Sequence, residues 1–230
     1  MTNNVSDALP AIRGRPHWTV RLLPPSSERR FALPSDCFAA ISKSHVELRG
    51  WDYPHIQDES DSRHGLSYPI VDGWELFVDF MSHHEVWRFT RAGQFIHYFS
   101  FWEDEEWTSP TTTFLSIEST IATLTEIIEF ASRLTGLADY TPSVDIEITL
   151  VGMAGRSLVA GPRRVLRREY VCREPEIPLT LAVPTSNIAA SRHQIARDFA
   201  REVFDLFTFR VDESILHDIQ RNILERRMSY

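Results

Sequence analysis

Three β-rich runs lie within residues 74–102, which read WELFVDFMSHHEVWRFTRAGQFIHYFSFW. The runs are residues 74–80, 85–89 and 95–102, and only a few residues join each run to the next. Short runs rich in valine and aromatic residues, joined by tight turns, are typical of an antiparallel meander. Gly93 suits the second turn because glycine readily adopts a positive φ. The sequence therefore predicts a central three-stranded meander.

The third run carries aromatic residues on both of its alternating faces. One face carries Phe95, Phe99 and Phe101, and the other carries Tyr98 and Trp102. A strand that is apolar on both sides is usually covered on both sides. We therefore expect helices on one face of the meander and another chain on its second face.

Further strands and helices are predicted before and after the meander. The strand candidates, in which apolar and polar residues alternate, are residues 17–23, 45–49, 144–150 and 177–183. The helix candidates, in which apolar residues recur every three or four positions, are residues 36–43, residues 117–134, a helix that opens at Ser191 and a helix that begins at Asp212. Because strands and helices do not alternate regularly, the pattern predicts an α+β fold. Its mainly antiparallel sheet would be packed by three to four helices, mostly in the C-terminal half.

Capping residues set the predicted ends of these helices. Ser35 is the N-cap candidate of the first helix, and Gly136 is the C-terminal stop of the second. Ser191 with Gln194 three residues later matches a capping box. The side chains expected to be buried in the last helix are Ile215, Ile219 and Ile223.

The chain divides into a short tail and one domain in our interpretation. Residues 1–15 combine Asn, Ser and Asp with an Arg-Gly-Arg-Pro sequence, which predicts a disordered N-terminal tail. Residues 16–230 form a single composite α+β domain, because the helix at 117–134 needs a surface for its apolar stripe and the meander is the nearest one. A boundary near residue 110 is the alternative, since all six tryptophans precede it.

Composition excludes several enzyme classes. Lys43 is the one lysine among 24 lysine and arginine residues, and Ser42 precedes it where a phosphate-binding loop requires glycine. The His-Arg-Asp and Asp-Phe-Gly motifs of kinases do not occur. The motifs of serine hydrolases, zinc proteases and dinucleotide-binding folds are absent as well. We therefore expect a protein that binds no cofactor, and a non-enzymatic role is favoured over a catalytic one.

Charge and cysteine content indicate the setting of the protein. A net charge of −8 argues against a protein that mainly binds nucleic acid or anionic membranes. The first ten residues lack the features of a signal peptide, and no apolar run reaches the ~20 residues of a membrane helix. Two cysteines, Cys37 and Cys172, are too few for a disulfide scaffold. With arginine in place of lysine, as in GC-rich genomes, these features predict a bacterial cytoplasmic protein with no membrane association.

The segment 48–56, LRGWDYPHI, is the strongest candidate for a functional site. It brings together a guanidinium, an indole, a carboxylate, a phenol and an imidazole, and with two residues of the meander it gives the predicted binding site: Arg49, Trp51, Asp52, Tyr53, His55, Trp87 and Arg88. Arginine beside tryptophan suits stacking on a planar ring. In the structural alternative, Trp51 and Tyr53 anchor the loop and Arg49 pairs with Asp52.

The histidines raise a metal hypothesis that their spacing does not support. Those considered are His45, His55, His64, His83, His84 and His97. No pair has the spacing of a closed zinc site, so we predict no metal ligands. His83 and His84 fall in a predicted turn, and His97 is expected in the core, bonded to a carbonyl. The enzymatic alternative is a metal-dependent hydrolase or nuclease that uses His55, His83 and His84 with Asp52 or Asp79.

One basic stretch supports a second alternative, which is nucleic-acid binding. Its arginines are Arg156, Arg163, Arg164, Arg167, Arg168 and Arg173. Guanidinium groups bind phosphate well, although interspersed glutamates weaken the pattern. Asp145 and Glu147 share one face of their strand, where we expect a solvated surface.

The excess of aromatic residues, beside the absence of catalytic motifs, favours a binding or accessory domain. Aromatic residues next to arginine are typical of interface anchors. We expect a protein partner or a second copy of the chain, with a small ligand as the alternative.

Overall fold

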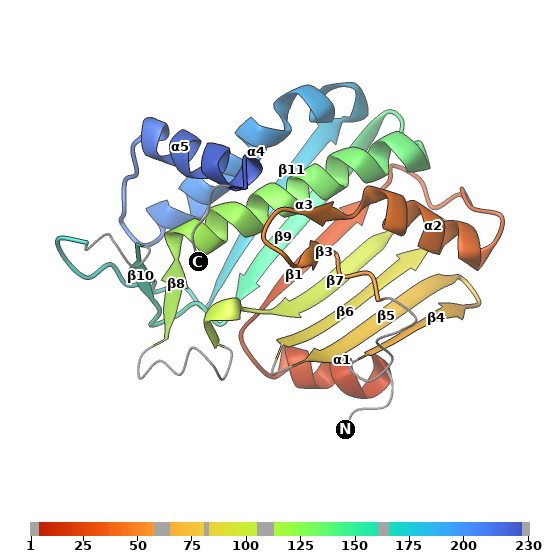
Figure 1. Ribbon diagram of the computed structural model, residues 1–230, viewed down its shortest axis with the longest axis horizontal. Coiled ribbons are helices and arrows are strands. Elements are labelled where there is room, and N and C mark those ends of the chain that lie inside the picture. The colour runs from red at the N-terminus through yellow and green to blue at the C-terminus, as the bar shows by residue number, and fades with distance from the viewer. Residues whose placement is uncertain (1–4, 58–64, 81–82, 105–112, 161–165, 227–230) are drawn as a thin grey trace.

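A seven-stranded antiparallel sheet forms the centre of the structure. The computed structural model describes residues 5–57, 65–80, 83–104, 113–160 and 166–226. The strands follow the order β11–β9–β1–β7–β6–β5–β4, and every neighbouring pair is antiparallel (Figure 1). In this order their bounds are Glu176–Pro184, Ser143–Val151, His17–Leu23, Phe95–Ser100, His83–Thr90, Gly73–Phe80 and Gly65–Ile70. The predicted α+β class with a mainly antiparallel sheet is confirmed.

The predicted meander is present as β5, β6 and β7. Leu76 on β5 lies opposite Trp87 on β6, which lies opposite His97 on β7. Gly93 has a φ of 88° in the second turn, as its position predicted. The sequence did not predict β4, because Pro69 interrupts its pattern. Proline is tolerated there since β4 is an edge strand of the sheet.

Helices α2 to α5 form a layer on one face of the sheet (Figure 1). Their bounds are Pro34–Ser44, Ile117–Ala138, Thr185–Asp205 and Glu213–Leu224. The long helix α3 is central, since it packs against the other three and its Phe130 ring contacts Phe95 of β7 at 4.8 Å. The predicted apolar stripe of α3 is buried: Ile117, Ile121, Leu124, Ile128, Ala131 and Leu134. Each buried isoleucine or leucine stabilises the fold by roughly 1.5–3 kcal/mol relative to an exposed one.

The second face of the meander is covered by a helix of the same chain, α1 (Val5–Arg13). Ala8 and Ile12 are buried against Phe77 of β5 and Val86 of β6, which point away from the main core. The prediction of a disordered tail over residues 1–15 is therefore wrong for α1, and residues 1–4 lie outside the described part. A helix this short is marginal in isolation, so local sequence did not reveal it. Because of α1, the described residues contain five α-helices rather than three to four.

The capping predictions at the first two helices were wrong. Ser35 lies inside α2, whose N-cap position is Leu33, and the Asp36 carboxylate accepts a hydrogen bond from the Leu33 amide at 2.9 Å. Gly136 lies inside α3, and the helix ends at Ala138, followed by the C-cap residue Asp139 with a φ of 47°. Aspartate adopts this left-handed conformation more readily than most residues, so the chain did not need the glycine.

At the last two helices one boundary was correct and one was not. Ser191 lies inside α4, where its hydroxyl donates to the Asn187 carbonyl at 2.8 Å, and the helix already begins at Thr185. Asp212 is the N-cap of α5, and its side chain accepts from the Ser214 amide at 2.8 Å. Ile215 is 41% exposed, whereas the adjacent Leu216 is buried with Ile219 and Ile223.

Short elements complete the fold. β2 (Val46–Glu47) and β3 (Asp52–Tyr53) form a small hairpin in which Gly50 has a φ of 86°. β8 (Phe114–Ser116) pairs in parallel with β10 (Ser157–Val159), and the 3₁₀ helix η2 (Trp102–Asp104) follows β7.

Strands from both sides of residue 110 belong to the one large sheet. The division into one composite domain stays a prediction. Among the described helices, none combines the length and apolarity needed to cross a bilayer.

Candidate functional site

The hairpin segment is attached to α3 through Arg49. The guanidinium Nε and Nη2 donate to the two carboxylate oxygens of Glu126 at 3.1 and 2.5 Å, and Nη2 also donates to the Thr123 hydroxyl at 2.9 Å. Burial raises the pKa of Glu126, and the charge of Arg49 opposes that shift. The predicted structural pairing of Arg49 with Asp52 is therefore wrong. The guanidinium of Arg49 donates hydrogen bonds to residues of α3, and these bonds fix the hairpin there.

Tyr53 attaches the other end of the hairpin to the core. Its ring is buried against Phe99 and Phe130, and its hydroxyl lies 3.2 Å from Nδ1 of His97. Burial raises the pKa of Tyr53 well above its usual value, and the nearby carboxylate of Glu85 adds to this. Tyr53 is therefore a neutral anchor rather than a surface contact.

A buried carboxylate, Glu85 of β6, lies at the centre of the site. Its Oε1 accepts from the His55 amide at 2.8 Å and lies 2.9 Å from Nε2 of His97, an approach that is close but poorly aligned for a hydrogen bond. Its Oε2 lies 3.4 Å from Nε2 of His83 and 3.5 Å from Nε1 of Trp51. We call these five residues the Glu85 cluster.

The charges of the Glu85 cluster follow from its burial. Burial alone would raise the pKa of Glu85, but the imidazoles of His97 and His83 hold it well below its usual range. Burial lowers the pKa of His97 despite the neighbouring carboxylate. The cluster therefore consists of an ionised carboxylate surrounded by N–H groups, which is the arrangement that makes a buried carboxylate tolerable.

His55 is held from several directions and forms a pair with Asp52. The two side chains meet at 2.6 Å, from Oδ1 to Nδ1, and Oδ2 of Asp52 accepts from the Ile56 amide at 2.7 Å. The His55 carbonyl accepts from Nε1 of Trp87 at 2.9 Å. The side chains of Asp52 and His55 are each 20% exposed. Burial acts to lower the pKa of His55, but Asp52 and Glu85 outweigh it and raise the pKa.

An array of rings extends from the Glu85 cluster to the surface. Trp51 stacks on His55 with ring centroids 4.4 Å apart, and it also contacts Phe80 at 5.9 Å and Trp102 at 5.8 Å. His83 stacks on Trp102 at 4.3 Å. Trp51, Phe80 and Trp102 are half-buried, whereas His83 is buried. The array therefore joins the buried carboxylate to an accessible aromatic surface.

The structure brings six of the seven predicted site residues together. Arg88 is the exception: it lies on the opposite face of β6 from Trp87, where it pairs with the buried Glu75, a carboxylate that also accepts from the Tyr68 hydroxyl at 3.0 Å. Adjacent strand residues face opposite sides, so Trp87 and Arg88 cannot serve one surface. Trp87 is fully buried, and its indole N–H donates to the His55 carbonyl.

Sequence reasoning missed the residues that organise the site. The sequence prediction omits Glu85, places His83 in a turn and gives His97 a carbonyl partner. In the structure His83 begins β6, and His83, Glu85 and Trp87 alternate on its core-facing side. A charged residue at a core-facing position of a strand is unusual, and that signal would have indicated Glu85.

The metal-dependent alternative has no geometric support among the described residues. His84 lies on the other face of β6, 3.3 Å from Asp79 and 3.1 Å from Arg15, so it is separated from His55 and His83. In the part of the chain that the structure describes, no three His, Cys, Asp or Glu side chains are placed to hold a metal ion. His64 lies outside that part.

The basic stretch is less available for phosphate than its composition indicated. Arg156 is fully buried, pairs with Asp104 and packs over the Phe101 ring at 4.5 Å. Arg163 and Arg164 lie outside the described residues, while Arg167, Arg168 and Arg173 are exposed. Asp145 is exposed, and Glu147 pairs with Arg21 at 2.9 Å on the outer face of the sheet, as expected for a solvated surface.

Comparisons with known proteins add no family to this description. No family matches the chain, and neither the curated proteins nor the solved structures give a match. The geometry around Glu85 is therefore the basis on which the function is inferred.

Proposed function

We propose that this chain is a binding domain that contacts a partner protein through Trp51, Asp52 and His55. The observation that carries this proposal is that the three side chains are partly exposed on a segment whose anchors are buried. The proposal keeps the bacterial cytoplasm as the setting expected from the sequence.

The anchors on both sides support a preorganised contact surface. Arg49 is bonded to the buried Glu126 on α3, and Tyr53 is buried beside His97. The backbone of His55 is fixed at its amide by Glu85 and at its carbonyl by Trp87. Since the segment is ordered by folding, little entropy remains to be lost when a partner binds.

The chemistry of the surface also suits recognition. Tryptophan is enriched among the residues that dominate binding energy at interfaces, because it buries a large rigid area and still donates a hydrogen bond. The raised pKa of His55 increases its cationic fraction near neutral pH, which favours an acidic group on the partner.

Site-specific photo-crosslinking tests the proposal. A photoreactive p-benzoylphenylalanine is placed at Leu48, on the hairpin, and in a separate variant at Leu66, which is 41% exposed on the edge strand β4. We expect adducts in cells from position 48 and not from position 66, and fewer adducts when Trp51→Ala is added. Trp74→Ala is the matched control, because Trp74 is also half-buried but bonds Ser67 at 2.8 Å away from the site.

Two results would count against a protein partner. One is the absence of adducts from position 48 in a protein that is folded by circular dichroism. The other is an adduct yield that Trp51→Ala and Trp74→Ala change equally. Sedimentation velocity of the purified protein then shows whether the partner is a second copy of the chain.

A second candidate function is acid–base chemistry, which the Asp52–His55 pair favours. Asp52 is oriented by the Ile56 amide and holds Nδ1 of His55 at 2.6 Å, so Nε2 is the atom that can exchange a proton with a substrate. Hydrolysis of p-nitrophenyl acetate and p-nitrophenyl phosphate provides the test. A rate that falls in His55→Gln but not in His217→Gln, an exposed histidine, supports this function, and equal rates contradict it.

A further inference from the structure

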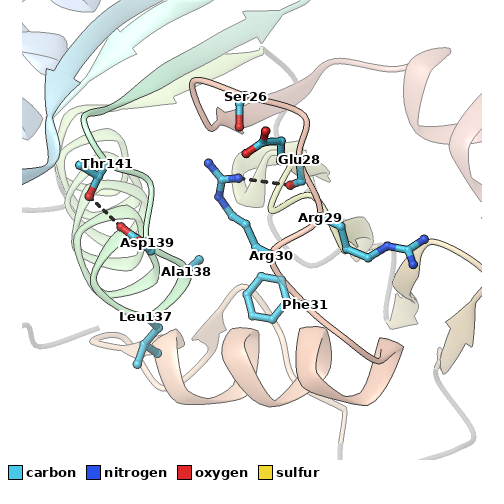
Figure 2. A pocket seen from close by; sticks show the side chains of 9 residues that line it. All are labelled: Ser26, Glu28, Arg29, Arg30, Phe31, Leu137, Ala138, Asp139 and Thr141. Carbon is cyan, nitrogen blue, oxygen red and sulfur yellow. Dashed lines mark hydrogen bonds between the residues drawn. The ribbon is translucent and has the colours of Figure 1, made fainter.

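A cavity of about 410 Å³ lies away from the Glu85 cluster, between segment 26–31 and the C-terminal end of α3 (Figure 2). It is lined by Ser26, Glu28, Arg29, Arg30, Phe31, Leu137, Ala138, Asp139 and Thr141. A cavity of this size is large enough for a small metabolite. Its lining is arranged in three chemically distinct parts.

Arg30 supplies a fixed positive wall. The backbone amides of Arg30 and Phe31 both donate to the Arg91 carbonyl, at 2.7 and 3.0 Å. The aliphatic part of Arg30 lies so close to Gly93 that a methyl group added to that glycine would be 3.1 Å from its Cδ. Its guanidinium carbon is 5.8 Å from the centre of the Tyr140 ring. These contacts place the guanidinium before any ligand arrives.

The guanidinium of Arg30 has donors that the described protein does not use. Nη1 donates to the Glu28 carbonyl at 3.2 Å, whereas Nε is shielded and has no hydrogen-bond partner among the described residues. Because Nε is shielded, a ligand in the cavity would be bound by the Nη groups of Arg30, which lines the cavity. Guanidinium groups pair best with the oxygens of a carboxylate or phosphate.

Asp139 and the end of α3 supply a negative wall. The carboxylate of Asp139 accepts from the Thr141 hydroxyl at 2.7 Å, and the last carbonyls of α3 form the negative end of the helix dipole. Hydrogen bonds from Thr141, and to a lesser extent the charge of Arg30, lower the pKa of Asp139. Arg30 and Asp139 come from the two segments that flank the cavity (Figure 2).

The third part of the lining is apolar. Phe31 is half-buried, Ala138 is buried, and Leu137 is 51% exposed although it is a large hydrophobic residue. In Figure 2 the side chains of Phe31 and Leu137 lie on the same side of the cavity, away from Thr141 and Ser26. A ligand that covers Leu137 would remove apolar surface from water, which is favourable.

From these three parts we infer that the cavity binds an α-amino acid with an apolar side chain. The carboxylate of the ligand pairs with Arg30, its ammonium group with Asp139 and the helix carbonyls, and its side chain packs on Phe31 and Leu137. A simple oxyanion such as phosphate fits less well, because it carries no positive group to offset repulsion by Asp139 and Glu28, both of which line the cavity. This site is independent of the proposed protein contact at Trp51.

Isothermal titration calorimetry of the full chain with L-leucine tests the inference. L-leucinamide lacks the carboxylate, 4-methylpentanoate lacks the ammonium group, and inorganic phosphate lacks both the ammonium group and the side chain. We expect L-leucine to bind at least about tenfold more tightly than each of these, because each analogue loses a charge-assisted contact. Stronger binding of phosphate than of L-leucine, or no binding of L-leucine to folded protein, overturns the inference.

Variants of the lining residues test whether L-leucine binds in this cavity. Arg30→Gln and Asp139→Asn should each weaken L-leucine binding by about tenfold or more. Arg21→Gln is the control, since Arg21 is exposed on the sheet and pairs with Glu147. Arg30→Lys keeps the charge but not the fork of donors, and should give an intermediate loss even if Arg30→Gln proves unstable. Unchanged affinity in both Arg30→Lys and Asp139→Asn contradicts the assignment.

Discussion

Glu85 occupies a core-facing position of β6, where a charged side chain needs a reason to be present. Its carboxylate accepts a hydrogen bond from the His55 amide. It also lies within 3.5 Å of the ring nitrogens of Trp51, His83 and His97. Glu85→Ala leaves these N–H groups buried without their acceptor. Each buried N–H left without an acceptor costs about 1–3 kcal/mol, so we expect Glu85→Ala to lower the free energy of unfolding by about 3 kcal/mol or more, as measured by urea denaturation.

Glu147→Ala is the matched control for this prediction. Glu147 also pairs with a cation, Arg21, but the two side chains are 37% and 45% exposed. An exposed ion pair contributes about 1 kcal/mol or less, so this variant should be nearly as stable as the native chain. If Glu85→Ala costs no more than Glu147→Ala, the carboxylate does not organise the site.

The pair of Asp52 and His55 gives a pH dependence whose sign follows from the raised pKa of His55. A group whose pKa is raised by folding stabilises the fold fully below its unfolded value of ~6.5. That contribution is lost as the pH rises through the folded pKa. Asp52→Asn removes a hydrogen-bond partner and a negative charge that together raise this pKa. We therefore expect Asp52→Asn to destabilise the fold more at acidic pH, below this window, than above it.

Two measurements check the pH prediction. Urea denaturation of both chains over a range of pH gives the difference in stability, and NMR titration of the His55 ring protons gives the pKa itself. Asp145→Asn is the control, because it removes one carboxylate from an exposed position on β9. A titration of His55 that Asp52→Asn and Asp145→Asn leave equally unchanged contradicts the role of the pair.

At the scale of elements, α1 depends on the sheet more than on its own sequence. It is short, contains Pro10, and meets β5 and β6 through the buried side chains of Ala8 and Ile12. Short helices are marginal alone, so loss of this contact should release the helix before the rest of the fold opens. We expect Ile12→Ala to remove the hydrogen-exchange protection of α1 while the amides of β6 stay protected.

Ala11→Ser is the control in α1, because Ala11 is exposed on the same helix. It should leave the exchange of the helix nearly as slow as in the native chain. Simultaneous loss of protection in α1 and β6 on Ile12→Ala would show instead that the helix opens only with the whole sheet.

The elements that could be predicted are those in which apolar residues recur at a regular spacing along the local sequence. The meander and α3 have long alternating or helical patterns, and both are present as predicted. β4 was missed because Pro69 interrupts it. α1 was missed because it packs against strands far along the chain, through residues such as Ala8 and Ile12. Ser191 matched a capping box yet lies inside α4. The helix already begins at Thr185, and Ile188 of its first turn is buried.

The candidate site could be predicted only where its residues are neighbours in sequence. Trp51, Asp52 and His55 stand in one segment, and their composition indicated them. The partner of Arg49 is Glu126, 77 residues away, and no local pattern relates the two. The local choice of Asp52 as the partner was therefore wrong. The register between β6 and β7 brings Glu85 and His97 together. This register cannot be predicted from the local sequence of either strand.

At the scale of the whole molecule, α3 holds the sheet and the other helices in contact. Ile128, in the middle of α3, is fully buried. If residues 16–230 form one composite domain, Ile128→Ala should lower the free energy of unfolding by about 2–5 kcal/mol in a single transition. Leu137→Ala is the control, because Leu137 is on the same helix and 51% exposed.

The chain itself supplies two probes that separate one domain from two. All six tryptophans precede residue 110, so fluorescence reports on that part, whereas α3, α4 and α5 lie after it and dominate the far-ultraviolet circular dichroism. One cooperative domain requires the two signals to change at the same urea concentration, in the native chain and in Ile128→Ala alike. If Ile128→Ala moves the dichroism transition but leaves the tryptophan transition in place, the halves unfold separately. The boundary near residue 110 would then divide two domains, because strands shared within one sheet would not have been enough to couple them.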